Sequence, residues 1–370
     1  MQKIVIPDRI NKVCRKVYWS FRSGLNSADR KGLKPLHLRQ NVKKRGDDEY
    51  VYSYTGGMFV DQEWGYLISR NGYLFEESLE FDFQIGKAPW RIGLPSPMDF
   101  QRARDSRCTV LKIPKAIVLR HFWEWNYYHF YADVLGKLNL LFEAGIDRDI
   151  PIILGKYVND VPFAPHVLKR GGLAKLNWIV PKEGEFIEVD EVIFCRTTQN
   201  KRDRLVPIVD LMGVQPLSSV DGDRIFLTRP QNAPRHIINH KEVEVMLHTH
   251  GFKTVDTTGI DTDSQIELFS NTRFLVAVHG AGIINMIFRK GCAMDVIELH
   301  PENYPTTDFR EMASQFGYGW FELMCKATRG NPQHANIFVD VDALEAQLIK
   351  MLPEKELAMP HESKRWPMAR

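Results

Sequence analysis

Hydrophobic and polar positions alternate regularly along the second half of the chain. Short apolar runs, typical of buried strands, are separated by segments in which apolar residues recur at helical spacing. The expected elements, alternating from a first strand, are 224–228, 240–249, 253–255, 263–270, 274–278, 283–288 and 294–299. Such alternation at short spacing predicts a parallel sheet with helices on both faces. A late strand over 337–341 and a helix over 343–352 end this half.

The first half has a less regular pattern. Aromatic-rich, strand-like runs at 50–54, 66–69 and 116–119 precede a long helical stretch at 127–144, and apolar runs at 150–154 and 191–194 predict further strands. Polar, turn-forming sequence at 200–222 predicts a domain boundary. We therefore expect four parts: a basic N-terminal segment (1–45), two α/β domains (46–210 and 211–345), and a C-terminal helix and tail (346–370).

Composition is that of an ordinary globular protein: of 370 residues, 44% are hydrophobic and 26% are charged. No apolar run approaches the roughly 20 residues that a membrane-spanning helix needs. The first residues lack the apolar core of a signal peptide. The five cysteines are scattered and include no C-x-x-C pair, which favours reduced thiols and argues against a structural zinc site. These features predict a cytoplasmic protein.

The net charge of +3 conceals a strongly basic N-terminal segment. Residues 1–45 hold thirteen Lys or Arg and two acids, so this segment carries +11 and the rest of the chain −8. Apolar residues between Ile10 and Phe21 recur at helical spacing among basic ones. Such a helix can make a peripheral contact with an anionic membrane, or pack its apolar face on its own domain. Nucleic acid is not an expected partner, because no nucleic-acid motif accompanies the charge.

The sequence His279-Gly280-Ala281-Gly282 stands between an expected strand and an expected helix. Glycines let a ligand approach the backbone and a helix start directs unpaired N–H groups at it, so an anion such as a nucleotide diphosphate suits this turn. The turn has neither the G-x-G-x-x-G of a dinucleotide site nor the G-K-[ST] of a P-loop. By itself it fits a purely structural strand-to-helix turn equally well.

Further charged side chains are expected at the same edge of the predicted sheet. Arg229 and Arg235 flank a proline-containing loop after the first strand, and Glu298 lies near the end of the fourth. Parallel α/β sheets bind ligands beyond the carboxyl ends of their strands, and guanidinium groups suit diphosphates. Alternatively, the two arginines belong to a solvated basic loop. Glu242, three residues after Asn239, fits a helix cap as well as a ligand.

A series of motifs occurs in a fixed order along the chain. It consists of Asn126-Tyr-Tyr-His129, Ala132-Asp-Val-Leu135, Arg224-Ile-Phe-Leu-Thr-Arg229, Arg235-x-Ile-Ile-Asn239, Glu242-Val, Gly251-Phe, Gln265-Ile-x-Leu-Phe269, Val278-His-Gly-Ala-Gly282, Asn285-Met-Ile-Phe288 and Val296-Ile-Glu-Leu299. Together these motifs resemble glycosyltransferase family 61, which includes plant glycan xylosyltransferases, the O-GlcNAc transferase of EGF domains and bacterial capsular-polysaccharide proteins. The chain departs from the family at Gly136, where relatives usually have proline.

The resemblance implies a GT-B architecture, in which two Rossmann-like domains face each other across a cleft that holds the active site. It implies an inverting hexosyl- or pentosyltransferase that moves a sugar from a nucleotide sugar, expected to be a UDP-sugar, to a glycan or polysaccharide acceptor. Residues 46–210 would then be the acceptor-side domain and residues 211–345 the nucleotide-sugar domain. Arg229, Arg235 and the turn from His279 to Gly282 would hold the diphosphate, and Glu298 would bind ribose or sugar hydroxyls. Asn285 either contacts the donor or only packs its helix.

The acceptor hydroxyl needs a base, which we expect from the first domain. His129 and Asp133 are i and i+4 on the predicted helix and so share a face, with Asn126 one turn earlier as a further contact. An aspartate can orient the imidazole while the histidine takes the proton. Alternatively, Asp133 is the base and His129 lines the site, or the aromatic-rich segment only packs between domains. His121 and Glu124 are weaker candidates.

Two other functions fit the same features: a polysaccharide pyruvyl transferase that uses phosphoenolpyruvate, and a catalytically inactive glycan-binding module. Three D-x-D sequences, at 221–223, 261–263 and 340–342, raise the possibility of a metal-dependent transferase. The first suits a turn, the second suits a helix cap, and the third lies at the very end of the expected nucleotide domain. We therefore expect neither a required metal nor another cofactor.

Overall fold

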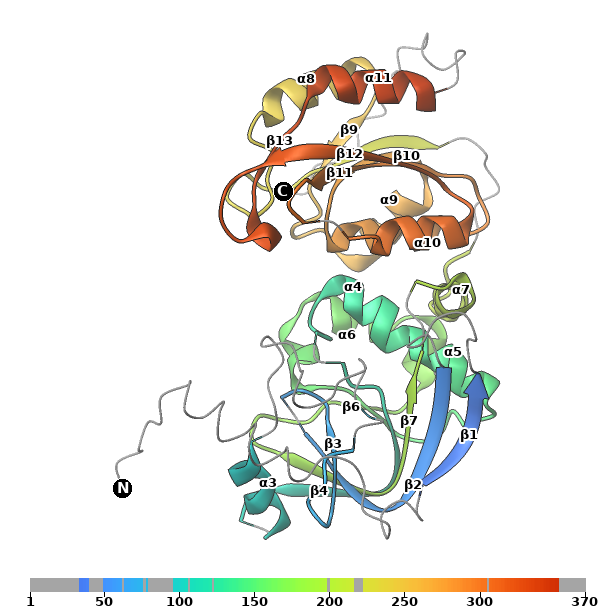
Figure 1. The fold of residues 1–370 in the computed structure, drawn as a ribbon. Helices are drawn as coiled ribbons and strands as arrows, with labels where there is room; N and C mark the ends of the chain where they lie inside the picture. Colours follow the sequence, from blue (N-terminus) through green and yellow to red (C-terminus); the bar gives the residue numbers. More distant parts are fainter. Residues whose placement is uncertain are drawn as a thin grey trace. The chain divides into compact units, whose positions relative to one another are not determined.

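The computed structural model describes residues 33–39, 49–61, 63–75, 78, 96–105, 107–121, 123–197, 200–215, 222–304 and 306–352. The chain divides into two compact units, Met1–Gly213 and Val214–Arg370 (Figure 1). Each unit combines helices with a β-sheet, so the predicted α/β class is confirmed. The basic helix expected between Ile10 and Phe21 lies outside the described residues. None of the helices in the described ranges is long and apolar enough to cross a membrane.

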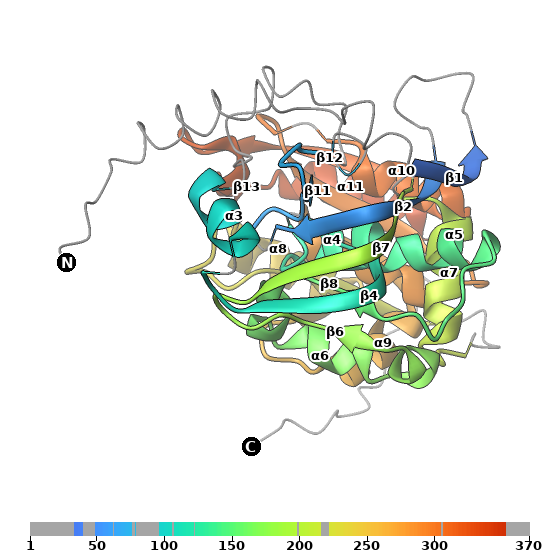
Figure 2. The same ribbon diagram turned by 90° about the horizontal axis from the view of Figure 1, so that it is seen from below.

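The first unit contains a seven-stranded mixed sheet in the order β1-β2-β7-β4-β5-β6, with β3 paired to β2. β4, β5, β6 and β7 form parallel pairs, whereas β2 is antiparallel to β1, β3 and β7. Figure 2 shows β2, β7 and β4 side by side. The strands are β1 (Leu33–Arg39), β2 (Glu49–Val60), β3 (Leu67–Ser69), β4 (Val110–Val118), β5 (Ile152–Ile153), β6 (Trp178–Ile179) and β7 (Phe186–Arg196).

The helical stretch predicted at 127–144 forms in three consecutive pieces. α4 (Tyr127–His129) continues into a π-helix at Phe130–Leu135 and then into α5 (Gly136–Glu143). All six residues of the π-helix are buried. π-Helical turns are rare and occur frequently at functional sites. The other helices of this unit are α3 (Pro97–Arg104), α6 (Phe163–Leu168), α7 (Arg202–Leu211) and two 3₁₀ helices, Lys156–Asp160 and Gly171–Lys175.

The range 200–222, in which the sequence predicts a domain boundary, contains the division between the two units, but its first part folds as helix α7. Leu205 and Ile208 are buried on one side of this helix. Arg204 is also buried, and its guanidinium lies 2.8 Å from Glu49 Oε2 and 2.8 Å from Glu143 Oε2. These partners are distant in sequence, so the local pattern gives no sign that Arg204 is buried in a helix.

The second unit contains a six-stranded sheet in the order β13-β12-β11-β10-β8-β9. Its pairs are parallel, as predicted, except for the antiparallel pair of β12 and β13. The strands are β8 (Asp223–Leu227), β9 (Lys253–Val255), β10 (Thr272–Val278), β11 (Asp295–Pro301), β12 (Gly319–Ala327) and β13 (Ile337–Phe338).

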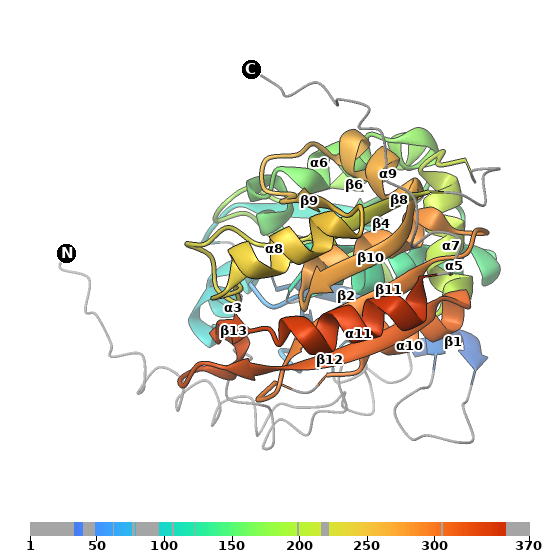
Figure 3. The same cartoon turned by 90° about the horizontal axis from the view of Figure 1, so that it is seen from above.

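Helices cover both faces of this second sheet. α8 (His240–Thr249) and α11 (Val341–Met351) lie side by side on one face (Figure 3), and α9 (Thr262–Ser270) and α10 (Asp308–Phe316) lie on the other. Apolar side chains of the sheet, such as Phe226 and Val276, pack with Val243 of α8 and Leu344 of α11 in one core. The helix predicted at 283–288 is a 3₁₀ helix, Ala281–Arg289.

Candidate functional site

The turn after β10 lies where the strand order of the second unit reverses. The chain passes from β8 to β9 on one side of β8 and then to β10 on its other side. Open α/β sheets bind ligands at such a switch point, beyond the carboxyl ends of the strands. Gly280 is the N-cap of the 3₁₀ helix that follows. A Cβ atom on Gly280 would lie 1.8 Å from Arg229 Nη2, so glycine makes room for this guanidinium at the turn.

Arg229 and Arg235 bring two positive charges to this turn, and neither forms an ion pair within the described ranges. Arg229 donates only to carbonyls, at 3.5 Å to His279 O and 3.4 Å to Pro234 O. Arg235 has a left-handed φ of 63°, which is uncommon for a residue other than glycine. Its Nε is buried without a hydrogen-bond partner among the residues described. Burial lowers the pKa of both guanidinium groups, that of Arg229 to about 10.

His279 belongs to a row of imidazoles and carboxylates next to the turn, in which His279, Glu298 and His300 are buried and Glu322 is exposed. Its Nδ1 lies 2.6 Å from Oε1 of Glu298 on the neighbouring strand β11. His300 also lies on β11, with its ring centroid 4.7 Å from that of His279. Glu322 on β12 reaches within 3.0 Å of His300 Nδ1. His300 Nε2 is buried and has no hydrogen-bond partner in the part of the chain that is described.

Burial favours the uncharged forms of His279 and Glu298. It lowers the pKa of His279 to about 3, with further lowering by Arg235 and Arg229. It raises the pKa of Glu298 to about 8. A protonated Glu298 donates to His279 Nδ1, which leaves the Nε2–H of His279 as a donor. Because this pair is then neutral, the charge of the two arginines stays uncompensated and attracts an anion.

The first unit contains a second cluster, centred on Asp133 in the π-helix. Oδ2 of Asp133 lies 2.5 Å from His129 Nδ1 and 3.7 Å from His121 Nε2. The two imidazole rings are stacked, with centroids 5.0 Å apart. The N–H of Trp123 donates to His121 Nδ1 at 3.1 Å, so the neutral ring of His121 carries its proton on Nε2, toward the carboxylate. Burial keeps His121 neutral by lowering its pKa to about 3.

His129 is the more accessible member of this cluster. Its side chain is 17% exposed, compared with 5% for Asp133. Because Nδ1 faces Asp133, Nε2 is the nitrogen left to act on a ligand. The indole ring of Trp123 lies 4.8 Å from the imidazole. Sequence patterns did not indicate Trp123 as a site residue, because no spacing rule links it to His129.

A buried ion pair supports the segment that carries His121. Arg120 Nη2 lies 3.0 Å from Glu124 Oε1, and both side chains are 1% exposed. Glu124 Oε2 accepts from the backbone N–H of His121 at 3.5 Å and of Gly155 at 3.1 Å. Glu124, which the sequence offered as a weaker candidate for the base, therefore holds this segment in place instead. Burial raises its pKa and the neighbouring Arg120 lowers it.

Several residues predicted for the site have other neighbours. Asn126 caps α4, where its Oδ1 accepts from the N–H groups of Tyr128 and His129. Asn285 is fully buried and donates to Gln265 Oε1 at 3.2 Å. Glu242 accepts from Asn239 Nδ2 at 3.2 Å and lines a different pocket, beside β13. The structure thus brings together Arg229, Arg235, His279–Gly282 and Glu298, and separately His129 and Asp133.

Two groups of described side chains have the donor types and spacing of a metal site: His121, His129 and Asp133, and His279, Glu298 and His300. Two imidazoles and one carboxylate suit zinc or iron. In the second group, the adjacent Arg229 and Arg235 oppose a cation. The described parts of the three D-x-D sequences have structural roles: Asp223 pairs with Lys253, and Asp261 and Asp340 cap helices.

Residues 127–296 match the model of a protein family described as Glycosyltransferase 61. The matched segment begins at α4, which carries His129, and includes Arg229, Arg235 and the turn at Gly280. Glu298 and His300 lie just beyond its end. No curated protein matches the chain.

Proposed function

We propose that this chain, whose residues 127–296 match the glycosyltransferase 61 family model as its motifs predict, is an inverting enzyme that transfers a sugar from a nucleoside diphosphate sugar to a glycan acceptor. The two uncompensated arginines at the Gly280 turn are the observation that carries this proposal. A diphosphate supplies the negative charge that they lack, and the N–H groups at the start of the 3₁₀ helix add hydrogen-bond donors.

His279 and Glu298 complete the proposed donor site. The neutral His279 donates from Nε2 to an oxygen of the donor, and Glu298 holds the imidazole in that orientation. The ring of His300 lies beside that of His279, and Glu322 lies 3.0 Å from His300 Nδ1. Arginines and backbone N–H groups stabilise the departing diphosphate, so the proposed mechanism requires no metal ion.

The proposed reaction is a direct displacement at the anomeric carbon. The acceptor hydroxyl gives its proton to His129 Nε2 while its oxygen attacks that carbon. The bond between the carbon and the diphosphate oxygen breaks, and its electron pair leaves with the nucleoside diphosphate. Attack opposite the leaving group inverts the configuration. Asp133 accepts from His129 Nδ1–H and stabilises the imidazolium that forms.

His129 is preferred to Asp133 as the base for two reasons. The carboxylate of Asp133 is buried and already engaged by His129. The imidazole keeps one nitrogen available, and histidine is the side chain that most often serves as a general base. The acceptor is proposed to be a glycan or polysaccharide, with a UDP-sugar as the donor.

Ligand-induced thermal stabilisation tests the donor assignment. We expect a nucleoside diphosphate, UDP first among UDP, GDP and CDP, to raise the melting temperature, because a ligand that binds only the folded state stabilises it. Phosphoenolpyruvate tests the pyruvyl transferase alternative and should have no effect. Stabilisation by phosphoenolpyruvate but by no nucleotide would contradict the proposal.

The same titration separates a metal-dependent donor site from the proposed one. With excess EDTA the shift produced by the nucleotide should persist. A shift that disappears with EDTA and returns with Mn²⁺ or Zn²⁺ would instead assign a metal to one of the two histidine clusters.

A further inference from the structure

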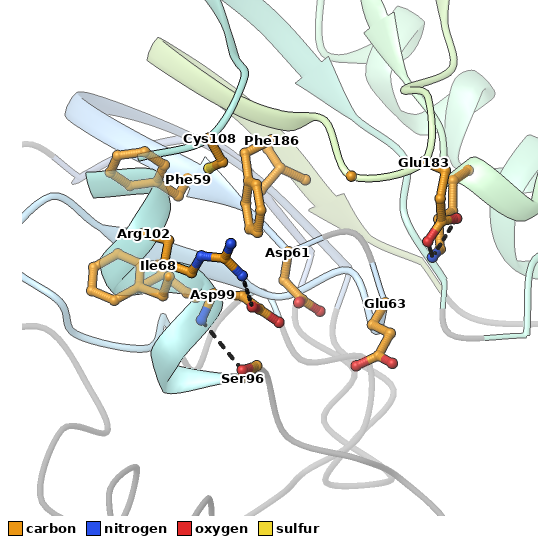
Figure 4. A pocket seen from close by; sticks show the side chains of 14 residues that line it. Phe59, Asp61, Glu63, Ile68, Ser96, Asp99, Arg102, Cys108, Glu183 and Phe186 are labelled. Carbon is orange, nitrogen blue, oxygen red and sulfur yellow. Dashed lines mark hydrogen bonds and ion pairs between the residues drawn. The ribbon is translucent and has the colours of Figure 1, made fainter. Parts of the chain in front are cut away.

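The first unit contains a pocket of about 380 Å³ that the proposed mechanism does not use (Figure 4). Its volume lies within the range of small-molecule sites, about 300–1,000 Å³. Ten of its fourteen lining residues precede residue 127, where the family match begins. Most of the pocket is therefore built from sequence that the family model does not cover.

One wall of the pocket is aromatic and apolar. Phe59 packs edge-on against Phe100, with ring centroids 5.6 Å apart, and Ile68 packs in the same cluster. Phe186, the first residue of β7, adds a partly exposed ring that points toward Asp61 (Figure 4). Aromatic faces carry partial negative charge and attract the C–H groups of an apolar ligand face. A pyranose ring has such a face.

The remaining lining is polar and acidic. Four carboxylates and two basic side chains line the pocket. Lys156 pairs with Glu183 at 2.8 Å, and Arg102 lies 3.9 Å from Asp99. Asp61 forms no ion pair within the described ranges; its Oδ2 accepts the N–H of Trp64 at 2.6 Å. Burial raises the pKa of Asp61 to about 6. Hydrogen bonds donated by a ligand would stabilise the charged form of this carboxylate.

Hydrogen bonds connect this pocket to the cluster that holds the proposed base. Arg120 Nη1 donates to the backbone carbonyl of Asp61 at 2.8 Å, and the same guanidinium pairs with Glu124. Glu124 in turn accepts from the backbone N–H groups of His121 and Gly155. Gly155 directly precedes Lys156 in the pocket wall. One buried network of hydrogen bonds, centred on Arg120 and Glu124, thus contacts both the pocket and the histidine cluster.

We propose that this pocket binds an uncharged sugar unit of the acceptor, with Phe186 against the C–H face of the ring and Asp61 accepting from its hydroxyls. This inference rests on the proposed glycosyltransferase function. The excess of carboxylates repels uronates and phosphates, so the pocket selects neutral sugars. Ten of the fourteen lining residues lie outside the family match, so acceptor choice would depend mainly on lining residues between 59 and 108, together with Phe186 from inside the match.

Saturation-transfer NMR on the full chain tests the pocket with maltose, cellobiose and N,N′-diacetylchitobiose, and with digalacturonate as the anionic comparison. Asp61→Asn removes the charge but retains an acceptor for Trp64, and Phe186→Leu removes the aromatic face but keeps an apolar side chain. Asp149→Asn is the matched control, since Asp149 is exposed and lies outside the pocket. We expect a neutral disaccharide to bind about tenfold more weakly to D61N and about threefold more weakly to F186L. D149N and UDP binding should be unchanged.

Three results would overturn the pocket assignment. They are equal disaccharide binding by wild type and both pocket variants, digalacturonate binding as tightly as the neutral sugars, and no saccharide binding at millimolar concentration by protein that still binds UDP. Saccharide binding that D61N weakens, in a protein that binds no nucleotide, would support the pocket while contradicting the proposed function.

Discussion

At the scale of single residues, the position of the Arg229 side chain depends on residue 280 being glycine. The guanidinium occupies the space that a side chain on residue 280 would need. Sequence patterns placed both residues at one edge of the sheet because parallel strands align their carboxyl ends there. They did not indicate His300, which meets His279 through the pairing of β10 with β11, or Glu322, which meets His300 through the pairing of β11 with β12. Glu298 and His300 are two residues apart on one strand, and this spacing was the sequence signal that could have indicated His300.

We predict that Gly280→Ala weakens nucleoside diphosphate binding as much as Arg229→Gln does, by about tenfold or more, because both changes remove the guanidinium from the turn. The double variant should bind no more weakly than either single variant, since the two changes abolish one interaction. Isothermal titration with UDP measures these affinities, with the exposed Arg329→Gln as control. Additive losses in the double variant would contradict this coupling.

The pair of His279 and Glu298 predicts how stability depends on pH. The pKa of Glu298 is raised from 4.5 to about 8 in the folded state, so folding becomes less favourable as pH rises through that window. The pKa of His279 is lowered from 6.5 to about 3 in the folded state, so the folded protein also loses stability as pH falls below about 6.5. Glu298→Gln mimics the protonated carboxyl and should remove the loss of stability on the alkaline side. Urea unfolding between pH 5 and pH 9 measures this; parallel pH profiles for wild type and E298Q would contradict it.

At the scale of elements, local sequence patterns predicted most strands and helices of the second unit within a few residues. They could not predict the π-helix at Phe130–Leu135, because it contains the same types of residue as a buried α-helix. They also missed α10 and β12; in β12 only Cys325 of nine residues is buried, so the strand has no run of buried positions. Long-range ion pairs, as at Arg204 in α7, leave no local signal.

The close contact between Gly155 and Glu124 allows a test of the buried ion pair between Arg120 and Glu124. A Cβ atom on Gly155 would lie 1.3 Å from Glu124 Oε1, although the backbone φ of −82° suits alanine. Gly155→Ala should therefore destabilise the protein by about 3 kcal/mol by displacing Glu124 from Arg120. Gly136→Ala is the control, because its Cβ meets nothing closer than 3.5 Å. Denaturation midpoints measure both; equal midpoints for G155A and wild type would contradict this role.

At the scale of the whole molecule, the ordered motifs predicted the family, and the match over residues 127–296 bears this out. The two units each carry one cluster of chemistry-bearing side chains: a cationic turn in the second, and an imidazole–carboxylate pair in the first. Donor sugar and acceptor depend on pocket shapes formed by residues far apart in sequence. The pocket at Asp61, lined by residues from 59 to 186, is one example that no linear pattern indicates.

The proposed reaction needs both clusters, so one turnover assay tests the central claim most directly. The release of UDP from UDP-sugars is followed with an acceptor glycan, for wild type, His129→Gln, Arg235→Gln and the exposed control His166→Gln. We predict that H129Q slows release at least a hundredfold, since general bases contribute about 10²–10⁴-fold, while leaving UDP affinity unchanged. R235Q should weaken UDP binding and turnover, and H166Q should change neither. Undiminished release by H129Q, or no release from any donor by protein that binds UDP, would contradict the account.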